Sequence, residues 1–444
     1  MANNESYDQE MERREYRHRR RVRNQIIAYI VTAIIVIGLI VAAAFGIKHL
    51  MTVIEDKKHA EELQQQLEEL SEMEVEAPVI EAPVAEPEVE EPVEEKSYLD
   101  EIVDACIAEM PLEDKVAGLF MITPEALTDT DLAIRAGDTT KEKLGEYSVG
   151  GLIYFSENMQ SADQLTEMLQ NTKGYSKYPI FLGVDEEGGE VSRVAESGLA
   201  DNVGKASDIG AAGDPQQAKD AGAAAGSYLA GFGFNVNFAP VADVKVIEDS
   251  VIGDRSYGSD AGQVGAMVAA GVEGIQSTGV SACLKHFPGL GSTTEDTHAG
   301  MAGSERTVEE FTQTEFAAFQ AGIDAGAEFV MVSHLSVPGI TGDNTPSSLS
   351  SIVVNDVLRG QLGYNGIVIT DAMDMGAITA YYTADQAAVM ALQAGVDMIL
   401  MPEDFETAYN GVLEAVNTGT LTEERIDESL RRIFRVKYKD KVEQ

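Results

Sequence analysis

Short apolar runs alternate with helix-like segments from residue 98 to the end of the chain. Eight of these runs have the length and composition of buried strands, at residues 118–124, 149–155, 178–187, 234–244, 281–287, 329–335, 366–371 and 397–402. Most segments between them, such as 308–327 and 385–396, are long enough for the crossover helix that parallel strands require. Residues 98–444 are therefore predicted to form one α/β domain, a (β/α)8 TIM barrel, with a doubly wound open sheet as the alternative.

The N-terminal pattern is different. A basic segment, residues 1–25, precedes residues 26–47, which contain no charged side chain and are long enough to cross a bilayer as a helix. A cleavable signal peptide is the alternative, but its apolar core would be shorter and a small-residue cleavage site would follow it. Because the basic flank comes first, we expect a single-pass cell membrane protein with a cytoplasmic N-terminus and an extracytoplasmic barrel.

Two segments connect the predicted span to the predicted barrel. Residues 48–73 carry three leucines at helical spacing among Glu and Gln, which predicts a short amphipathic stem helix and a candidate dimer contact. Residues 74–97 contain four prolines among many acidic residues. Like charges repel and proline prevents regular pairing, so this segment is predicted to be a disordered linker.

Composition and missing motifs narrow the function. The 444 residues include 75 acidic and 32 basic side chains, a formal net charge of -43, which argues against nucleic acid as a partner. The two cysteines have neither disulfide-framework nor zinc-site spacing. The sequence also lacks an H-E-x-x-H, a P-loop and a G-x-S-x-G motif. We therefore expect no metal site, no cofactor, and neither nucleotide hydrolysis nor serine-esterase chemistry.

Ionisable residues gather where the predicted strands end, and in a barrel this edge carries the functional site. They are Asp185 and Glu187, Asp243, Lys285 and His286, His334, and Asp371. We expect His334 to be a satisfied structural histidine and Asp243 to orient its neighbours. The remaining set combines carboxylates with proton donors, which is the equipment for splitting a glycosidic bond.

Five motifs occur in order along the domain: GVDEEGGEVSRV, NVNFAPVADV, GDRSYG, KHFPGLGSTTEDTHAG and GIVITDAMDMGAI. With them, residues 99–440 resemble glycoside hydrolase family 3, and within it the bacterial β-N-acetylglucosaminidases. The resemblance implies that Asp371 is the nucleophile and that His298 with Asp296 supplies the acid/base group. It also implies five residues that hold the sugar, namely Asp185, Arg193, Arg255, Lys285 and His286.

The residues themselves suit these roles. A carboxylate at a barrel rim can form a glycosyl ester that water then opens, with retention of configuration. Histidine titrates near neutrality, and the aspartate two residues before His298 can fix its tautomer. Glycines at 289, 291, 300 and 303 are expected to let this loop bring the histidine over the bond and withdraw it.

Each assignment has a structural alternative. Asp371 could be the N-cap of a helix that follows its strand. His298 could be a solvated loop histidine. Arg193 and Arg255 could form structural ion pairs in an acidic domain.

Two residues depart from the family pattern: Leu290 replaces a common histidine and Glu190 a common arginine. About 40 residues follow the eighth strand, too few for a second α/β domain, so the acid is expected to be local. The predicted location suggests terminal β-linked N-acetylglucosamine in peptidoglycan fragments as substrate. Phosphorolysis stays open because a histidine acid/base does not repel phosphate, and so does a non-catalytic wall-binding or sensor module.

Overall fold

The computed structural model of this protein describes residues 97–298 and 300–439. The predicted basic segment 1–25, membrane helix 26–47, stem helix 48–73 and linker 74–97, apart from Ser97, lie outside the described residues. Among the helices of the described part, none is long and apolar enough to span a membrane. The first described helix, α2 (Tyr98–Ala108), begins where the sequence places the start of the barrel domain.

A parallel, near-closed barrel of eight strands forms the centre of this domain. The strands are β1 (Phe120–Ile122), β2 (Gly151–Tyr154), β3 (Phe181–Val184), β6 (Val236–Asn237), β7 (Ser281–Phe287), β8 (Phe329–Val332), β9 (Ile367–Thr370) and β10 (Ile399–Leu400). Each strand pairs in parallel with the next one in sequence, and β10 pairs with β1. A parallel bridge between Ile369 and Met398 joins β9 to β10. The (β/α)8 prediction is confirmed, and the open sheet is excluded because the strand order is sequential and cyclic.

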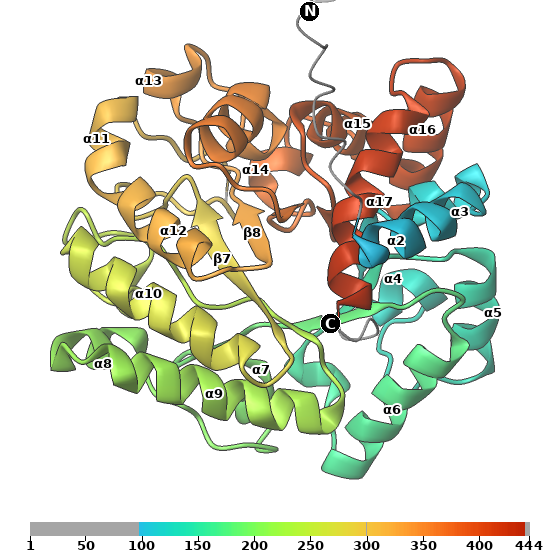
Figure 1. Cartoon of the computed structure of the whole chain (residues 1–444), viewed down its shortest axis with the longest axis horizontal. Helices are drawn as coiled ribbons and strands as arrows, with labels where there is room; N and C mark the ends of the chain where they lie inside the picture. The colour runs from blue at the N-terminus through green and yellow to red at the C-terminus, as the bar shows by residue number, and fades with distance from the viewer. Residues whose placement is uncertain (1–96, 299, 440–444) are drawn as a thin grey trace, which may run out of the picture. The chain divides into compact units, whose positions relative to one another are not determined.

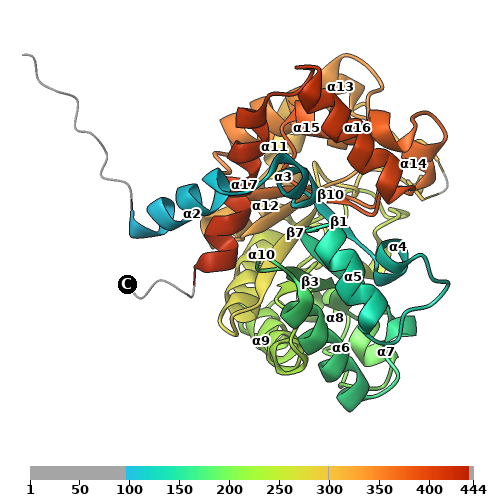
Figure 2. The ribbon, with the colours of Figure 1, turned by 90° about the vertical axis from the view of Figure 1, so that its right-hand side faces the viewer.

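Helices surround the barrel strands (Figure 1). The longer ones are α6 (Ala162–Tyr175), α9 (Pro215–Phe232), α10 (Ala261–Gln276), α12 (Glu315–Asp324), the π-helix η4 (Ile352–Gln361), α15 (Ala384–Ala394), α16 (Phe405–Asn417) and α17 (Glu423–Tyr438). The shorter helices are α3 (Leu112–Ala117), α4 (Pro124–Thr128), α5 (Asp138–Glu146), α7 (Arg193–Glu196), α8 (Ala206–Ala212), α11 (Val308–Gln313), α13 (Pro338–Thr341) and α14 (Gly376–Thr379), with 3-10 turns η1 (Ser156–Asn158), η2 (Gly253–Arg255) and η3 (Ser347–Leu349). Neighbouring helices such as α9 and α10 run alongside each other on the outside of the strands (Figure 2).

Local sequence signals set the helix limits. Asp214 caps α9 by accepting a hydrogen bond from the Gln216 N–H, and Pro215 occupies the first turn, where its missing N–H costs nothing. Gly233 ends this helix with a φ of 111°, a conformation that glycine adopts without strain. The strands of the barrel are buried along their whole length, because helices cover the outside and side chains fill the inside.

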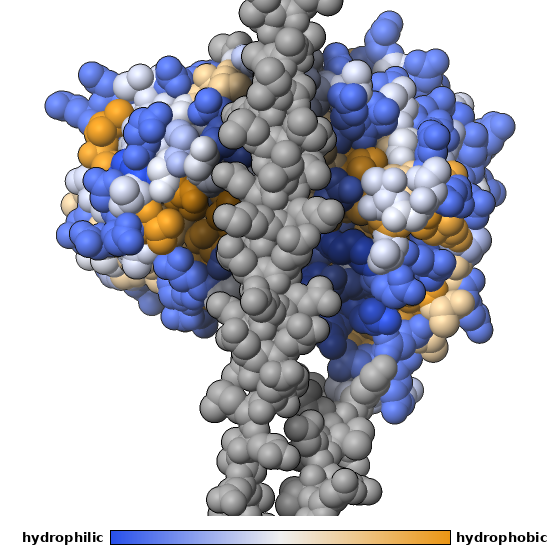
Figure 3. All heavy atoms as spheres, turned by 90° about the horizontal axis from the view of Figure 1, so that it is seen from above, coloured by the Kyte–Doolittle hydropathy of each residue, from blue (hydrophilic) through white to orange (hydrophobic). Residues whose placement is uncertain are grey.

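The surface contrasts with this core. Seen from above, the visible described side chains are mainly hydrophilic, with smaller hydrophobic areas between them (Figure 3). Acidic residues dominate the chain's charge, so most of this surface repels polyanions.

The ends of the strands place the ionisable residues. Asp185 directly follows β3, Asp371 directly follows β9, and His286 lies in the last two residues of β7. Because all eight strands are parallel, their carboxyl ends lie at one end of the barrel. The candidate site is therefore built at that end.

Candidate active site

A cavity of about 450 Å³ opens at the carboxyl ends of the strands. All eight residues that the sequence singles out for the site line it: Asp185, Arg193, Arg255, Lys285, His286, Asp296, His298 and Asp371. They come from loops and strand ends far apart in the sequence. The fold thus brings the predicted site residues into one shared cavity.

The segment after β3 directs two carboxylates toward the cavity and one away from it. Here the chain forms a two-stranded hairpin of β4 (Glu186–Gly188) and β5 (Val191–Ser192), and Asp185 and Glu187 line the cavity. Glu186 between them is buried on the other side, where it accepts hydrogen bonds from the Val194 N–H at 2.7 Å and the Tyr228 hydroxyl at 2.9 Å. Side chains on an extended segment alternate in this way. Glu186 thereby fixes the start of α7.

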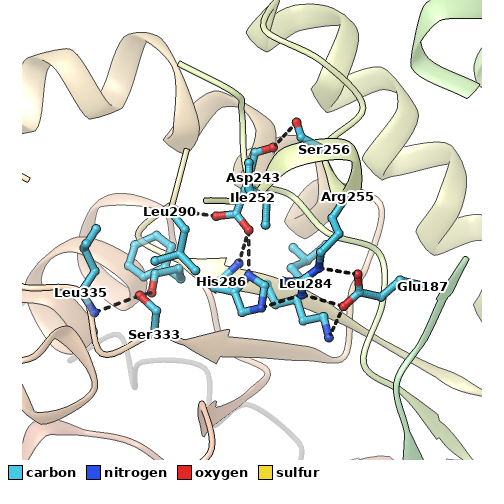
Figure 4. Close-up of polar contacts among 12 residues, drawn as sticks. Glu187, Asp243, Ile252, Arg255, Ser256, Leu284, His286, Leu290, Ser333 and Leu335 are labelled. Carbon is cyan, nitrogen blue, oxygen red and sulfur yellow. Dashed lines mark hydrogen bonds and ion pairs between the residues drawn. The ribbon is translucent and has the colours of Figure 1, made fainter. Parts of the chain in front are cut away.

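A largely buried cluster of ion pairs lines the cavity. Lys285 bonds Asp185 and lies 2.7 Å from Glu187, whose carboxylate also takes a bidentate pair from Arg255 at 2.7 and 2.8 Å. Figure 4 shows Arg255 and Glu187 facing each other in this way. Burial opposes the charge on Glu187, but Lys285 and Arg255 outweigh it and lower its pKa to about 2. Burial likewise disfavours the charge on Lys285, and the two carboxylates more than compensate, so its pKa is raised.

A second buried carboxylate orients His286. Asp243 is fully buried and accepts hydrogen bonds from the backbone N–H of His286 at 3.1 Å and of Leu290 at 2.6 Å. Its Oδ2 also lies 2.7 Å from His286 Nδ1, while Nε2 on the other edge of the ring lies 3.3 Å from Arg255 Nη2 (Figure 4). The peptide bond between Lys285 and His286 is cis.

Asp371 lies at the exit of β9, on the cavity wall. Its backbone N–H donates to the Val332 carbonyl at 2.8 Å, and its Oδ1 accepts from the Ala372 N–H at 2.9 Å. Burial raises the pKa of this carboxyl, but His286 and the Ala372 N–H lower it, and the net shift is downward. Asp371 is therefore held as a carboxylate. It does not cap a helix, because α14 begins only at Gly376 with Met375 as its N-cap.

The Asp296–His298 pair lies on the loop between β7 and α11. Asp296 Oδ1 accepts from the His298 backbone N–H at 2.9 Å and lies 2.8 Å from its Nδ1. The His298 N–H and ring outweigh a smaller burial effect and lower the pKa of Asp296. The His298 side chain is 73% exposed. It combines a solvated position with a fixed partner, so it can exchange protons with the cavity and with water.

Backbone hydrogen bonds attach this loop to the loop that follows Asp371. The Gly376 N–H donates to the His298 carbonyl at 3.2 Å, and the Ala377 N–H donates to the Thr297 carbonyl at 3.1 Å. The proposed acid/base histidine and the proposed nucleophile are therefore tied through adjacent backbone.

Comparison with known proteins identifies the family. Residues 111–436 match the family model described as the glycosyl hydrolase family 3 N terminal domain. The chain belongs to glycosyl hydrolase family 3.

Proteins similar to this chain include β-hexosaminidases and a β-N-acetylglucosaminidase. Beta-hexosaminidase A of Pseudoalteromonas piscicida is 32% identical over 67% of this chain and 54% of its own length. The beta-hexosaminidase of Stenotrophomonas maltophilia strain K279a is 36% identical over 62% of this chain and 83% of its own. A solved family 3 β-N-acetylglucosaminidase from Paenibacillus sp. str. FPU-7 aligns with a TM-score of 0.70 and 35% identity, over 76% of this chain and 64% of that one. The alignments thus span only about half to two thirds of the first and third of these relatives.

The structure answers two questions that the sequence left open, the role of His334 and whether Arg255 forms a structural ion pair. His334 is fully buried, with Nδ1 2.8 Å from the Ser348 hydroxyl and Nε2 2.9 Å from the Ala372 carbonyl, so the structural interpretation is confirmed. Arg255 both forms an ion pair and lines the cavity.

Arg193 is less tightly held than Arg255. Its guanidinium lies 3.6 Å from Glu196 and 5.7 Å from the centre of the Phe155 ring. Its Nε is buried without a hydrogen-bond partner among the described residues. A buried donor in this state can accept a new partner at little cost, so Arg193 is suited to binding a ligand oxygen.

Gly289 and Gly291 were expected to make the loop flexible, but the structure shows that they allow close packing. A Cβ at Gly291 would lie 1.6 Å from the Val244 carbonyl oxygen, and one at Gly289, where φ is 128°, would meet the Glu315 side chain at 2.4 Å. Close approach therefore requires glycine at these positions. A Cβ at Gly300 would have no neighbour within 4 Å, and one at Gly303 would come no closer than 3.7 Å to another atom, so at these two positions freedom of the loop is the better explanation.

Sequence reasoning left two ionisable residues of the cavity out of the site. Glu187 was identified as a strand-end carboxylate but given no role, although its spacing of two from Asp185 predicts the same side of an extended segment. Asp374 lines the cavity three residues after Asp371, and burial and the Asp371 charge raise its pKa. Within the described residues, no group of three or more His, Cys, Asp and Glu side chains is arranged to hold a metal ion.

Proposed function

We propose that this protein is a retaining β-N-acetylglucosaminidase that removes terminal β-linked N-acetylglucosamine. The observation that carries the proposal is that Asp371 and the Asp296–His298 pair line one cavity. The relatives named above as β-hexosaminidases and β-N-acetylglucosaminidases support the substrate class.

In the first step, an Asp371 oxygen attacks the anomeric carbon and forms a glycosyl ester. The glycosidic bond breaks, and protonated His298 gives its proton to the departing oxygen. The lowered pKa of Asp371 keeps the nucleophile ionised, and burial next to His286 limits its solvation. Asp296 holds the His298 ring through Nδ1, so Nε2 is the nitrogen that faces the leaving group.

In the second step, water attacks the same anomeric carbon from the side that the aglycone has left. His298 Nε2 takes the proton of this water, and the ester bond to Asp371 breaks. Two inversions give net retention. Asp185, Lys285, Arg193 and Arg255 supply charged hydrogen-bonding groups around the sugar hydroxyls, and the ion pairs of the cluster hold three of them in place.

The test is turnover of a chromogenic N-acetyl-β-glucosaminide. We expect the wild-type protein to release N-acetylglucosamine and Asp371→Ala to lose essentially all activity. Asp324→Ala is the matched control, since Asp324 is an exposed aspartate on α12 away from the cavity. Full activity in Asp371→Ala refutes the proposed nucleophile. Tight sugar binding without any product favours the non-catalytic sensor.

Phosphorolysis is the second candidate. It is favoured by the proton donor, since the imidazole of His298 carries no fixed negative charge to repel an incoming phosphate. The distinction lies in the product: a phosphorylase forms N-acetylglucosamine 1-phosphate when phosphate is present. Mass analysis of the products with and without phosphate separates the two reactions.

We also propose that residues 26–47 anchor the protein in the cell membrane, with residues 48–97 as stem and linker and the barrel outside. The basic residues before this segment support the orientation. An enzyme so placed meets cell-wall glycan, and muropeptides are the proposed substrates. Protease added to intact cells should digest the barrel but spare the N-terminus, and purified muropeptides should lose terminal N-acetylglucosamine.

A further inference from the structure

The buried carboxylate of Asp243 bonds two parts of the candidate site at once. It does not line the cavity, yet its two oxygens accept three hydrogen bonds, and all three come from the segment that begins with His286. Two come from His286 itself and the third from the Leu290 N–H, at the root of the loop that carries His298 (Figure 4). One carboxylate thus fixes both a cavity side chain and the start of the acid/base loop.

The hydrogen-bond partners define which ring nitrogen of His286 carries the proton. An ionised carboxylate only accepts hydrogen bonds, so the 2.7 Å contact requires a proton on Nδ1. On the other edge of the ring, Arg255 Nη2 lies 3.3 Å from Nε2, and a guanidinium only donates. Nε2 therefore faces a donor and presents a lone pair.

We propose that Asp243 is a positioning residue that holds His286 in the Nδ1–H tautomer, with Nε2 as a hydrogen-bond acceptor toward the sugar. A substrate hydroxyl that approaches His286 then donates a hydrogen bond to Nε2 in place of the 3.3 Å contact with Arg255, whose guanidinium stays paired with Glu187. This inference rests on the proposed function, because it assigns His286 a role in binding the substrate of that reaction. The proposal adds Asp243, which lies outside the cavity, to the residues that support substrate binding.

The substitution Asp243→Asn disturbs this arrangement, because one carboxylate oxygen becomes an N–H donor. At the Oδ2 position this donor opposes the His286 backbone N–H and moves the ring proton to Nε2, against Arg255. At the Oδ1 position it opposes the Leu290 N–H. We expect Asp243→Asn to lower kcat/KM for the chromogenic substrate by about ten- to a hundredfold, the cost of mispairing a charge-assisted hydrogen bond. Ser256→Ala is the matched control: its buried hydroxyl donates to the Asp243 main-chain carbonyl at 2.7 Å and does not contact His286.

A double-mutant cycle separates positioning from a general structural role. If Asp243 acts through His286, Asp243→Asn should change kcat/KM by less than about twofold in a His286→Ala background. A purely structural Asp243 would lower kcat/KM by the same factor in both backgrounds, and that result overturns the inference. Wild-type activity in Asp243→Asn overturns it as well.

A measurement on the wild-type protein covers the case in which Asp243→Asn does not fold. The ¹⁵N shifts of the histidine rings report which nitrogen carries the proton, and the His286 signal is the one absent from His286→Ala. We expect protonated Nδ1, and a neutral ring protonated at Nε2 refutes the inference. Because this reading needs no turnover, it stays informative if an inactive wild-type protein refutes the proposed function.

Discussion

Substitution of Glu187 tests how strongly the ion pairs at the cavity stabilise the barrel. Its side chain is 4% exposed and contacts two cations, Lys285 at 2.7 Å and Arg255 through two hydrogen bonds. Glu187→Gln keeps the shape and removes the charge. Lys285 then keeps Asp185 as an ion-pair partner, whereas Arg255 loses the carboxylate that it bonds.

The lowered pKa of Glu187 gives the size of its contribution to the free energy of unfolding. The pKa of Glu187 falls from the ordinary 4.5 to about 2, and each pH unit corresponds to about 1.4 kcal/mol, so the charged form contributes about 3 kcal/mol to the free energy of unfolding. Breaking a buried ion pair by removing one partner costs a similar ~3–5 kcal/mol in other proteins. We therefore expect Glu187→Gln to lower the free energy of unfolding by about 3 kcal/mol at pH 7.

The pH dependence checks the cause. A carboxyl with a lower pKa in the folded protein contributes fully above its unfolded pKa of about 4.5 and loses this contribution as the pH falls toward about 2. The difference between wild type and Glu187→Gln should therefore be constant from about pH 7 to about pH 5.5 and shrink below about pH 4.5.

The assay is urea unfolding followed by circular dichroism at a series of pH values. Glu190→Gln, an exposed glutamate on the turn of the same hairpin, is the control and should match wild type. Equal unfolding midpoints for wild type and Glu187→Gln, or a difference that does not shrink in acid, would refute the reasoning.

Three further predictions concern other parts of the barrel. Asp296→Asn should lower kcat by about ten- to a hundredfold, most for substrates with poor leaving groups, because His298 loses its charged partner; equal losses for good and poor leaving groups would contradict this. Gly291→Ala should cost about 1–3 kcal/mol of unfolding free energy, since its Cβ would overlap the Val244 carbonyl, whereas Gly300→Ala should cost nothing; both are read from urea midpoints. Asp397→Asn should lower the free energy of unfolding by about 3–5 kcal/mol, because Arg359 at 2.7 Å and Arg432 at 3.0 Å lose a fully buried charged partner. The control Asp356→Asn, at an exposed position on η4, should leave the urea midpoint unchanged.

The barrel could be predicted because buried parallel strands appear as separate apolar runs. The limits of the strands could not. The run 234–244 yields only β6, Val236–Asn237, because pairing after it is interrupted. The Phe238 N–H still donates to the Val184 carbonyl, but Pro240 has no N–H to donate, and pairing returns only as the isolated bridge between Val241 and Lys285. A periodicity in sequence reports burial, and burial occurs outside strands as well.

The residues of the site could be predicted from strand ends and motifs, but their partners could not. Glu187 contacts Arg255 and Lys285, and Asp243 contacts His286, across long stretches of sequence that carry no signal of the pairing. The same limit explains Gly289 and Gly291, whose close neighbours Glu315 and Val244 belong to other segments. Composition identifies which groups are present, whereas the closed barrel decides which of them meet.

The site divides into a rigid part and an exposed part, and this division has a consequence for mutants. Lys285 and Glu187 are buried and share hydrogen bonds with the partly exposed Arg255, so loss of this cluster should change both stability and sugar binding. The Asp296–His298 pair is mostly exposed and bonds chiefly within its own loop, so its loss should change kcat with little effect on unfolding. Substitutions of the proposed nucleophile's buried surroundings and of the proposed proton donor should therefore be told apart by their different effects on unfolding.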